Sequence, residues 1–313
     1  MHGVTTIDAG YGGHDGFAAV FLIGDGEEAA FVETNTTRAV PRLLAALAAA
    51  GRRPEDVRWI AITHVHLDHA GGAAALMAAC PRATLLAHPK AAAHVVQPEK
   101  LVKSAKAVYG REAFEALYGT IAPVPADRVR AMAPGETVAL GGRRLRFFPT
   151  RGHANHHVCI HDSHANGVFT GDSFGICYPH LQERGLFVFP TTTPTDFDAA
   201  AALASLDAIV GTGADRVFLT HFGEREDVAA IADQLRPQLV TYGALVDEAD
   251  AAGIDGEALD EHLRRAVRAE LGRHLSEHGV SVDLEGDPLL RVDADLNAQG
   301  LAFAVRKRRF KRG

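Results

Sequence analysis

One stretch, residues 63–69 with the sequence THVHLDH, constrains the fold of this chain more than any other. It follows the apolar, β-branched run 57–63 and precedes the small-residue run 70–79, so we expect a strand, a short loop and a helix in succession. In an extended backbone side chains alternate with a period of two, and His64 and His66 therefore point the same way. The stretch predicts a loop at a strand end that presents several polar side chains to one place.

The side chains in this stretch are of the types that bind transition metals. The histidines His64, His66 and His69 and the carboxylate of Asp68 lie within six residues of one another. Nitrogen and oxygen donors grouped in this way suit zinc or iron. The alternative is a surface group of histidines, or a strand end with Asp68 as a helix cap. Four donors at this spacing favour the metal site.

Later strand-like runs also end in residues that bind metals. These ends carry His153, Asp172 and His221. Loops at one edge of a rigid sheet can bring such side chains together. Any one of them alone would more often be structural, whereas the repeated pattern indicates one shared site.

The pattern of elements predicts an α/β fold with a helical C-terminal part. Ala-rich helical segments alternate with Val-, Ile- and Phe-rich strands over the first two-thirds of the chain. From about residue 224 the pattern changes to long amphipathic helices, with Pro237 kinking or splitting the first of them. A last helix is expected from Asp293 into a basic tail. We expect a catalytic domain and a helical extension packed on it, residues 1–223 and 224–313.

Charge and cysteine content limit the function classes. The formal charge of −7 disfavours binding of nucleic acid over the whole surface. The exception is the basic tail, residues 306–312, which we expect to be solvated and frayed. Three cysteines are too few and too scattered for a disulfide framework. No signal sequence or membrane-spanning stretch is recognisable, so we expect a cytoplasmic protein.

In their order along the chain, these motifs resemble those of the metallo-β-lactamase superfamily, which includes glyoxalase II and the acyl-homoserine-lactone lactonases. The resemblance covers about residues 4–223 and implies an αββα sandwich with the site at one edge. It also implies two divalent metal ions, zinc by preference and otherwise iron or manganese. The ligands would be His64, His66 and His153 for one ion, Asp68, His69 and His221 for the other, and Asp172 as the bridge.

The resemblance implies a hydrolase that acts with a metal-bridging hydroxide on an ester, thioester, lactone or phosphoester of a small molecule. Asp68 would also orient the hydroxide or move a proton. Glu33, where many members have Asp, and His157 would support the ligands from behind rather than bind metal. The apolar loop after Asp172 is expected to offer the substrate contacts, or merely to pack, through Phe174, Tyr178 and His180.

Two other activities fit part of the pattern. A persulfide dioxygenase of the same superfamily would hold one iron with His64, His153 and Asp172. A nuclease of the ribonuclease Z type is supported only by the basic tail, because the rest of the chain is acidic. We therefore expect a small-molecule substrate rather than nucleic acid or a membrane as the partner, and the C-terminal helices offer a contact for a homodimer.

Overall fold

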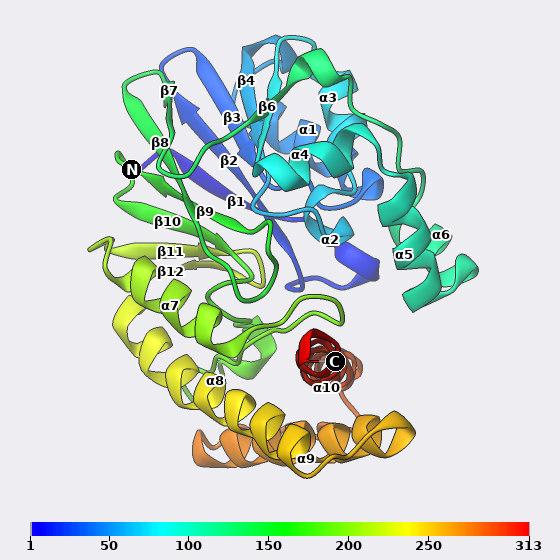
Figure 1. Cartoon of the computed structure of the whole chain (residues 1–313). Coiled ribbons are helices and arrows are strands. Elements are labelled where there is room, and N and C mark those ends of the chain that lie inside the picture. Colours follow the sequence, from blue (N-terminus) through cyan, green and yellow to red (C-terminus); the bar gives the residue numbers. More distant parts are fainter. Residues whose placement is uncertain (1, 313) are drawn as a thin grey trace. The chain divides into compact units, whose positions relative to one another are not determined.

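The computed structural model describes residues 2–312, and its elements are labelled in Figure 1. The strands are β1 (Val4–Asp8), β2 (Ala19–Asp25), β3 (Glu28–Val32), β4 (Val57–Ala61), β5 (Thr84–Ala87), β6 (Val129–Ala131), β7 (Thr137–Leu140), β8 (Arg143–Pro149), β9 (Val158–Asp162), β10 (Gly167–Gly171), β11 (Arg216–Leu219) and β12 (Gly223–Arg225). The helices are α1 (Val40–Ala49), α2 (Leu67–Ala70), α3 (Ala73–Ala79), α4 (Pro89–Val96), α5 (Glu99–Tyr109), α6 (Arg111–Tyr118), α7 (Ala199–Val210), α8 (Val228–Ala251), α9 (Gly256–Glu277) and α10 (Pro288–Arg312). The predicted α/β class is confirmed: two sheets flanked by helices, with helices at the C-terminal end.

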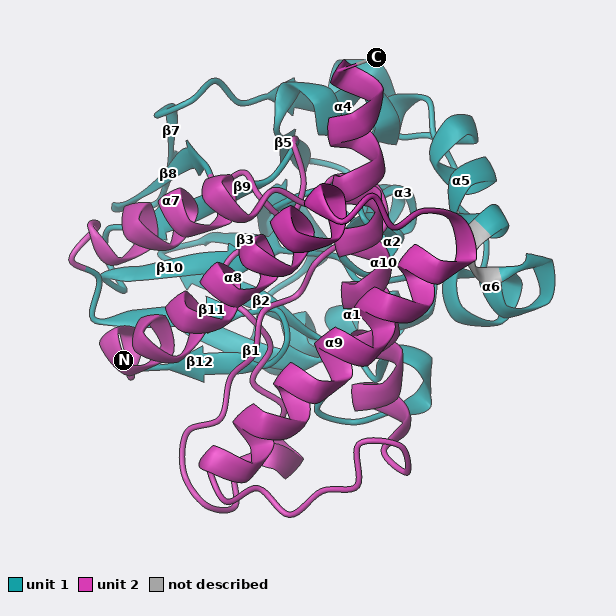
Figure 2. Ribbon diagram, turned by 60° about the horizontal axis from the view of Figure 1, so that its bottom comes forward, with its two compact units in different colours: residues 1–149, 156–171, 214–226 teal, residues 150–155, 172–213, 227–313 magenta. Residues whose placement is uncertain are grey.

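The chain divides into two compact units that interleave along the sequence, coloured teal and magenta in Figure 2. Unit 1 comprises residues 1–149, 156–171 and 214–226, and unit 2 comprises residues 150–155, 172–213 and 227–313. The expected division at 223/224 differs from these units, because α7 packs against α8 and so joins the C-terminal helices.

Unit 1 contains both sheets. One has the strand order β1-β2-β3-β4-β5-β6 and the other the order β12-β11-β10-β9-β8-β7. In the first sheet β3, β4, β5 and β6 run parallel to one another, and in the second β10 and β11 are parallel. The chain therefore leaves β3 and β4 at the same end of the first sheet, and β10 and β11 at the same end of the second.

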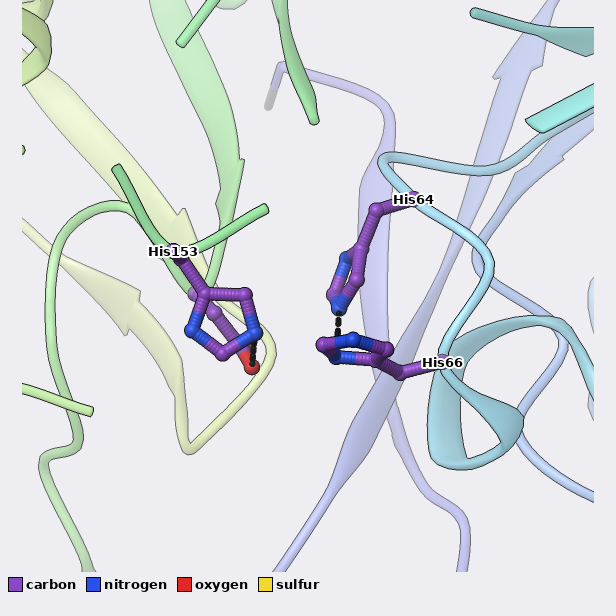
Figure 3. A group of neighbouring side chains, drawn as sticks. His64, His66 and His153 are labelled. Carbon is purple, nitrogen blue, oxygen red and sulfur yellow. Dashed lines mark hydrogen bonds and ion pairs between the residues drawn. The ribbon is translucent and has the colours of Figure 1, made fainter. Parts of the chain in front are cut away.

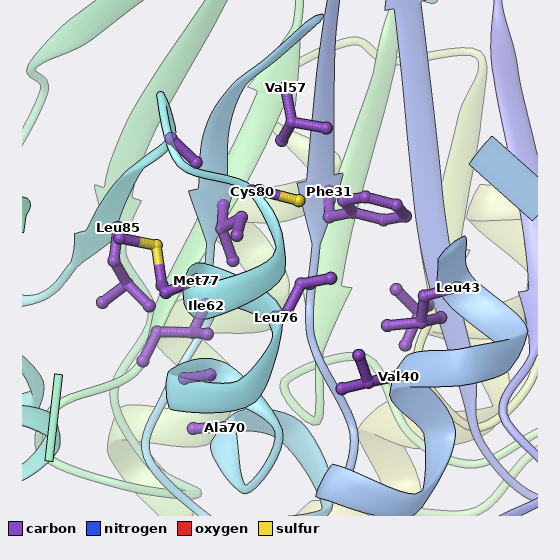
Figure 4. Packing of buried hydrophobic residues seen from close by; sticks show 14 of the residues in the cluster. Phe31, Val40, Leu43, Val57, Ile62, Ala70, Leu76, Met77, Cys80 and Leu85 are labelled. Carbon is purple, nitrogen blue, oxygen red and sulfur yellow. The ribbon is translucent and has the colours of Figure 1, made fainter. Parts of the chain in front are cut away.

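Side-chain alternation along β2 shows how unit 1 is layered. Val20 and Leu22 enter the core that the first sheet shares with α1 and α3, which Figure 4 shows from close by. Ala19, Phe21 and Ile23 enter the second core, shared with strands of the other sheet. All five side chains are buried, and each large one contributes about 1.5–3 kcal/mol to stability. The first sheet is thus packed on both faces within unit 1.

Unit 2 is built on α7, α8, α9 and α10. In this unit α10 packs against both α8 and α9. Asp198 caps α7 by accepting a hydrogen bond from the Ala201 N–H at 3.0 Å. Helix α8 continues through Pro237 rather than ending there.

The basic tail differs from its prediction. Instead of fraying, it forms the last turns of α10, which begins at Pro288 rather than near Asp293. Its cations pair with acidic residues of the same unit: Arg306 with Asp260, Lys307 with Asp196, Arg308 with Asp247, and Arg309 and Arg312 with Asp250. The tail continues a helix whose preceding residues Leu301, Ala302 and Val305 are buried, and its charges find partners on neighbouring elements, which the local sequence alone does not reveal.

Other predicted elements hold with small changes. The helical segment 89–118 is broken at Gln97-Pro98 and again at Gly110, whose φ of 79° ends α5. The short strand β12 was not predicted. Among the helices of residues 2–312, none combines the length and apolarity needed to cross a bilayer.

Candidate metal centre

The parallel strand pairs deliver the polar side chains to the site. Glu33 follows β3, and the loop with His64 and His66 follows β4. Asp172 follows β10 and His221 follows β11. Within unit 1, the Val158 N–H donates to the Thr63 carbonyl at 2.8 Å and the Ala19 N–H to the Thr220 carbonyl at 2.8 Å, which ties the two sheets together at these ends.

The loop after β4 enters α2 directly after His66, so Asp68 and His69 occupy the first turn of a helix. Gly72, just beyond α2, allows this turn to lie close to the preceding loop. A Cβ atom there would sit 2.7 Å from the Thr34 carbonyl oxygen and 2.8 Å from that of Thr36. A glycine is therefore required for the turn to occupy this place.

His64 and His66 present nitrogens to each other. The distance from His64 Nε2 to His66 Nδ1 is 2.9 Å, drawn dashed in Figure 3, and the rings are nearly perpendicular. The ring centroid of His69 lies 4.0 Å from that of His64. These three histidines thus form one cluster at the end of β4, inside unit 1.

Asp68, His69 and His221 form a second group in the same unit, with one ligand atom from each within 4.8 Å of the others. Asp68 Oδ2 lies 3.5 Å from His69 Nε2 and 3.4 Å from His221 Nε2. Burial raises the pKa of the Asp68 carboxyl, but the charges and hydrogen bonds of the two histidines outweigh burial and bring that pKa well below its usual value. Asp68 is therefore a carboxylate at neutral pH.

The far nitrogens of the histidines are oriented by oxygen acceptors. His69 Nδ1 donates to Glu33 Oε1 at 3.1 Å, and His221 Nδ1 donates to the Phe17 carbonyl at 2.7 Å. His64 Nδ1 lies 3.0 Å from the hydroxyl of Thr63, which in turn donates to Glu33. Nδ1 of each ring thus faces an oxygen partner, and Nε2 is the nitrogen that faces the cluster, where it would carry the lone pair for a metal ion.

Glu33 is fully buried and links these supports. Its carboxylate accepts from the Thr63 backbone N–H at 3.3 Å and from the Thr220 hydroxyl at 3.5 Å, besides the contacts to His69 and the Thr63 hydroxyl. Its φ of 69° is unusual for a residue with a side chain. One carboxylate thus connects the end of β3 with the ends of β4 and β11.

His157 lies behind His64, with ring centroids 4.8 Å apart, and it is fully buried. A Cβ atom on Gly171, whose φ is 48°, would lie 2.5 Å from both His157 Nε2 and Thr63 Oγ1. Only glycine therefore fits at the end of β10. His156 is nearer to the rings of His66 and His94, at 5.9 Å and 6.2 Å.

In unit 2, His153 and Asp172 form a pair. His153, labelled in Figure 3, has its Nε2 3.2 Å from Asp172 Oδ2. Its Nδ1 donates to the Thr191 carbonyl at 3.3 Å. Both side chains are buried. They line a cavity of about 20 Å³ in unit 2, together with Arg151, Ser173, Gly175, Pro190, Thr191, Ala202, Leu235 and Leu239. That volume holds roughly one water molecule.

The side chains expected to contact substrate have other surroundings. Phe174 and Tyr178 are fully buried, and the Tyr178 hydroxyl donates to Asp293 Oδ2 at 2.9 Å. His180 is exposed, with Nε2 2.9 Å from Asp287 Oδ2. Phe174 and Tyr178 therefore pack the loop, which is the alternative that the sequence left open. A role of these residues toward substrate stays a prediction.

The donor set fits divalent metal. Two nitrogens, each about 2.0–2.1 Å from a zinc ion, lie about 3.3 Å apart in a tetrahedron. The separations within the ligand pairs run from 2.9 to 3.5 Å, close to that value. Imidazole and carboxylate groups that are buried or half-buried in this arrangement are suited to zinc, iron or manganese.

The sequence analysis overlooked several of the groups that orient the histidines. The hydroxyl of Thr63 adjoins His64 in sequence, and a polar residue between a strand and a ligand was a usable signal. The acceptors at Phe17 and Thr191 are backbone carbonyls. No residue type marks a carbonyl as an acceptor, so these two had no sequence signal.

The chain is similar to known proteins in both sequence and fold. The model of the Metallo-beta-lactamase superfamily matches residues 14–221. The metallo-beta-lactamase fold-containing protein ST1585 of Sulfurisphaera tokodaii is 25% identical over 254 residues, which are 79% of this chain and 79% of that protein.

Two solved structures have a similar fold. That of the archaeal superfamily protein ST1585 from Sulfolobus tokodaii superposes with a TM-score of 0.64 at 24% identity, covering 76% of this chain and 86% of the other. That of the metallo-beta-lactamase family protein TTHA1429 from Thermus thermophilus has a TM-score of 0.65 at 21% identity, covering 99% and 95%. The second comparison includes the C-terminal helices.

Proposed function

This chain belongs to the metallo-β-lactamase superfamily, and from that premise we propose that it is a hydrolase that uses two divalent metal ions. Its substrate is an ester, thioester, lactone or phosphoester of a small molecule. Many chemistries occur on one fold, so the proposal rests on the site rather than on the family alone.

The observation that carries the proposal is the orientation of the histidines in unit 1. His64, His69 and His221 each have Nδ1 directed at an oxygen, which leaves Nε2 as the lone-pair donor. Surface histidines have no need of such buried supports, whereas metal ligands almost always have them. Asp68 adds a carboxylate between His69 and His221.

We propose that the pair in unit 2 completes the site. The matched region of the superfamily, residues 14–221, includes every one of these ligands. One ion would be held by His64, His66 and His153, and the other by Asp68, His69 and His221, with Asp172 bridging. The ligand separations within each unit support this assignment.

Each protein group has a task in such a reaction. Divalent ions at this site would polarise the substrate oxygen and lower the pKa of a water toward neutrality. Asp68, a half-buried carboxylate that is ionised at neutral pH, would orient the attacking water or move a proton. Glu33 keeps His69 and, through Thr63, His64 in the orientation that binds metal.

The experiment is metal analysis by plasma mass spectrometry on protein purified without added metal, paired with turnover assays. The panel contains a small ester, a thioester, a lactone and a phosphoester. About two divalent ions per chain with turnover of a panel member supports the proposal. One iron per chain, with oxygen uptake on a persulfide and no hydrolysis, would instead indicate a dioxygenase.

Zinc as the native metal, a cytoplasmic location and a homodimer stay predictions. The same metal analysis tests the first, and light scattering of the purified protein tests the last. The ribonuclease-like alternative loses its support in the basic tail, because Arg306, Lys307 and Arg309 are engaged by acidic residues of unit 2.

A further inference from the structure

Asn297, on α10, holds the backbone of the loop that leads to the metal ligands of unit 2. Its Oδ1 accepts from the Thr192 N–H at 2.6 Å, and its Nδ2 donates to the Pro190 carbonyl at 2.9 Å. The Thr192 hydroxyl donates back to the Asn297 carbonyl at 3.0 Å. All these groups are buried, so each bond is costly to lose.

Gly300, one turn further along α10, lets the helix approach this loop closely. A Cβ atom there would lie 2.1 Å from Thr192 Oγ1 and 2.9 Å from the Thr193 carbonyl oxygen. The helix therefore meets the loop through its backbone at Gly300 and through the Asn297 side chain. Two independent features hold the segment 190–193 against α10.

Thr191 lies between Pro190 and Thr192, the two residues to which the Asn297 side chain is hydrogen-bonded. The carbonyl of Thr191 accepts a hydrogen bond from His153 Nδ1 at 3.3 Å. We propose that Asn297 is a positioning residue: by fixing residues 190–192 it aims the Thr191 carbonyl at His153 and so orients Nε2 of that ligand. This inference rests on the proposed function in taking His153 as a metal ligand. It assigns a role in the metal site to the C-terminal helix.

A merely structural role of Asn297 would affect stability but not His153. Asp293 is a matched control, since it is buried on the same helix and binds the same loop through the Tyr178 hydroxyl, away from residues 190–192. Asn297→Ala, Asn297→Asp and Asp293→Asn would be prepared as full-length proteins. Circular dichroism and thermal unfolding check that each variant folds. If Asn297→Ala does not fold, Asn297→Asp replaces it in the test, because aspartate keeps the size of the side chain and an acceptor oxygen.

The experiment measures zinc affinity by chelator competition and the protonation of His153 Nδ1 by ¹H–¹⁵N NMR. We expect both Asn297 variants to bind one of the zinc ions about 10–100-fold more weakly. Their Nδ1–H signal of His153 should shift or disappear, while Asp293→Asn keeps wild-type values. Equal affinity and an unchanged signal in the Asn297 variants would overturn the inference alone. A wild-type protein that binds neither zinc, iron nor manganese would overturn the proposed function and this inference with it.

Discussion

The two units support their candidate metal ligands in different ways. In unit 1 the supports lie at strand ends: Glu33 directly follows β3, and Thr63 precedes His64. In unit 2 the support of His153 is a loop that is held by Asn297, and that residue lies 105 positions from its partner Thr192. A hydrogen-bonded sheet fixes its own ends, whereas a loop needs a separate element to fix it. The comparison leads to four predictions.

Removing one ligand from each unit tests whether both units serve one site. Asp172→Ala in unit 2 is expected to release metal and to lower turnover about 10³-fold, because several kcal/mol of transition-state stabilisation is lost. His69→Ala in unit 1 should lower turnover by a comparable factor. Metal content and turnover are measured together, with Asp233→Ala, an exposed carboxylate of α8, as the control. Full metal content with full activity in Asp172→Ala would contradict the proposal.

Acid should weaken unit 2 through His274, whose Nε2 donates to the Val188 carbonyl at 3.0 Å. Burial lowers the pKa of His274 to about 4, from 6.5 in the unfolded chain, against the raising effect of the Val188 carbonyl. Between these values the unfolded chain binds more protons, so stability falls as the pH drops from about 6.5 to about 4, by about 3 kcal/mol.

Urea unfolding at several pH values measures this effect. His274→Gln is expected to show a much smaller fall over the same window, because glutamine does not titrate. His262→Gln, a change on the same helix α9, is the control. If wild type and His274→Gln lose stability in parallel, the assignment to His274 is wrong.

Glu33→Gln tests the support in unit 1. It removes the charge that His69 Nδ1 and the Thr63 hydroxyl face while keeping the shape of the side chain. We expect metal affinity to fall about 10–100-fold, the usual effect of losing a group that orients a ligand. Chelator competition measures it, and the exposed Glu55→Gln should not differ from wild type. An unchanged metal affinity in Glu33→Gln would show that Glu33 does not support the metal ligands.

The smallest effect is expected on the surface of unit 2, where Arg308 pairs with Asp247 and both side chains are largely exposed. Such pairs contribute roughly 0.2–1 kcal/mol and are screened by salt. Arg308→Ala should therefore change the free energy of unfolding by about 0.5 kcal/mol, and less at high salt. A loss of several kcal/mol in urea unfolding would show that the tail matters far more than its exposure indicates.

The sequence predicted the local features well. The THVHLDH stretch supplies its donors within a few residues, and the β-branched run 57–63 marked strand β4, Val57–Ala61, to within two residues of its end. It did not predict that α7 joins the C-terminal helices, that the tail pairs with acidic residues, or that Asn297 grips residues 190–192. These features depend on contacts between residues far apart in the chain, and no local pattern records such contacts.

The long separation between Asn297 and its loop has a consequence for the newly made protein. Thr192 leaves the peptidyl-transferase centre 105 residues before Asn297 does. At about 5–20 residues per second, the ribosome adds Asn297 roughly 5–20 s after Thr192. During that interval the two sheets can already pair their strands, β11 and β12 included, but the carbonyl that faces His153 still lacks its helix. On the function proposed above, a nascent chain therefore reaches its full affinity for metal only once α10 has emerged.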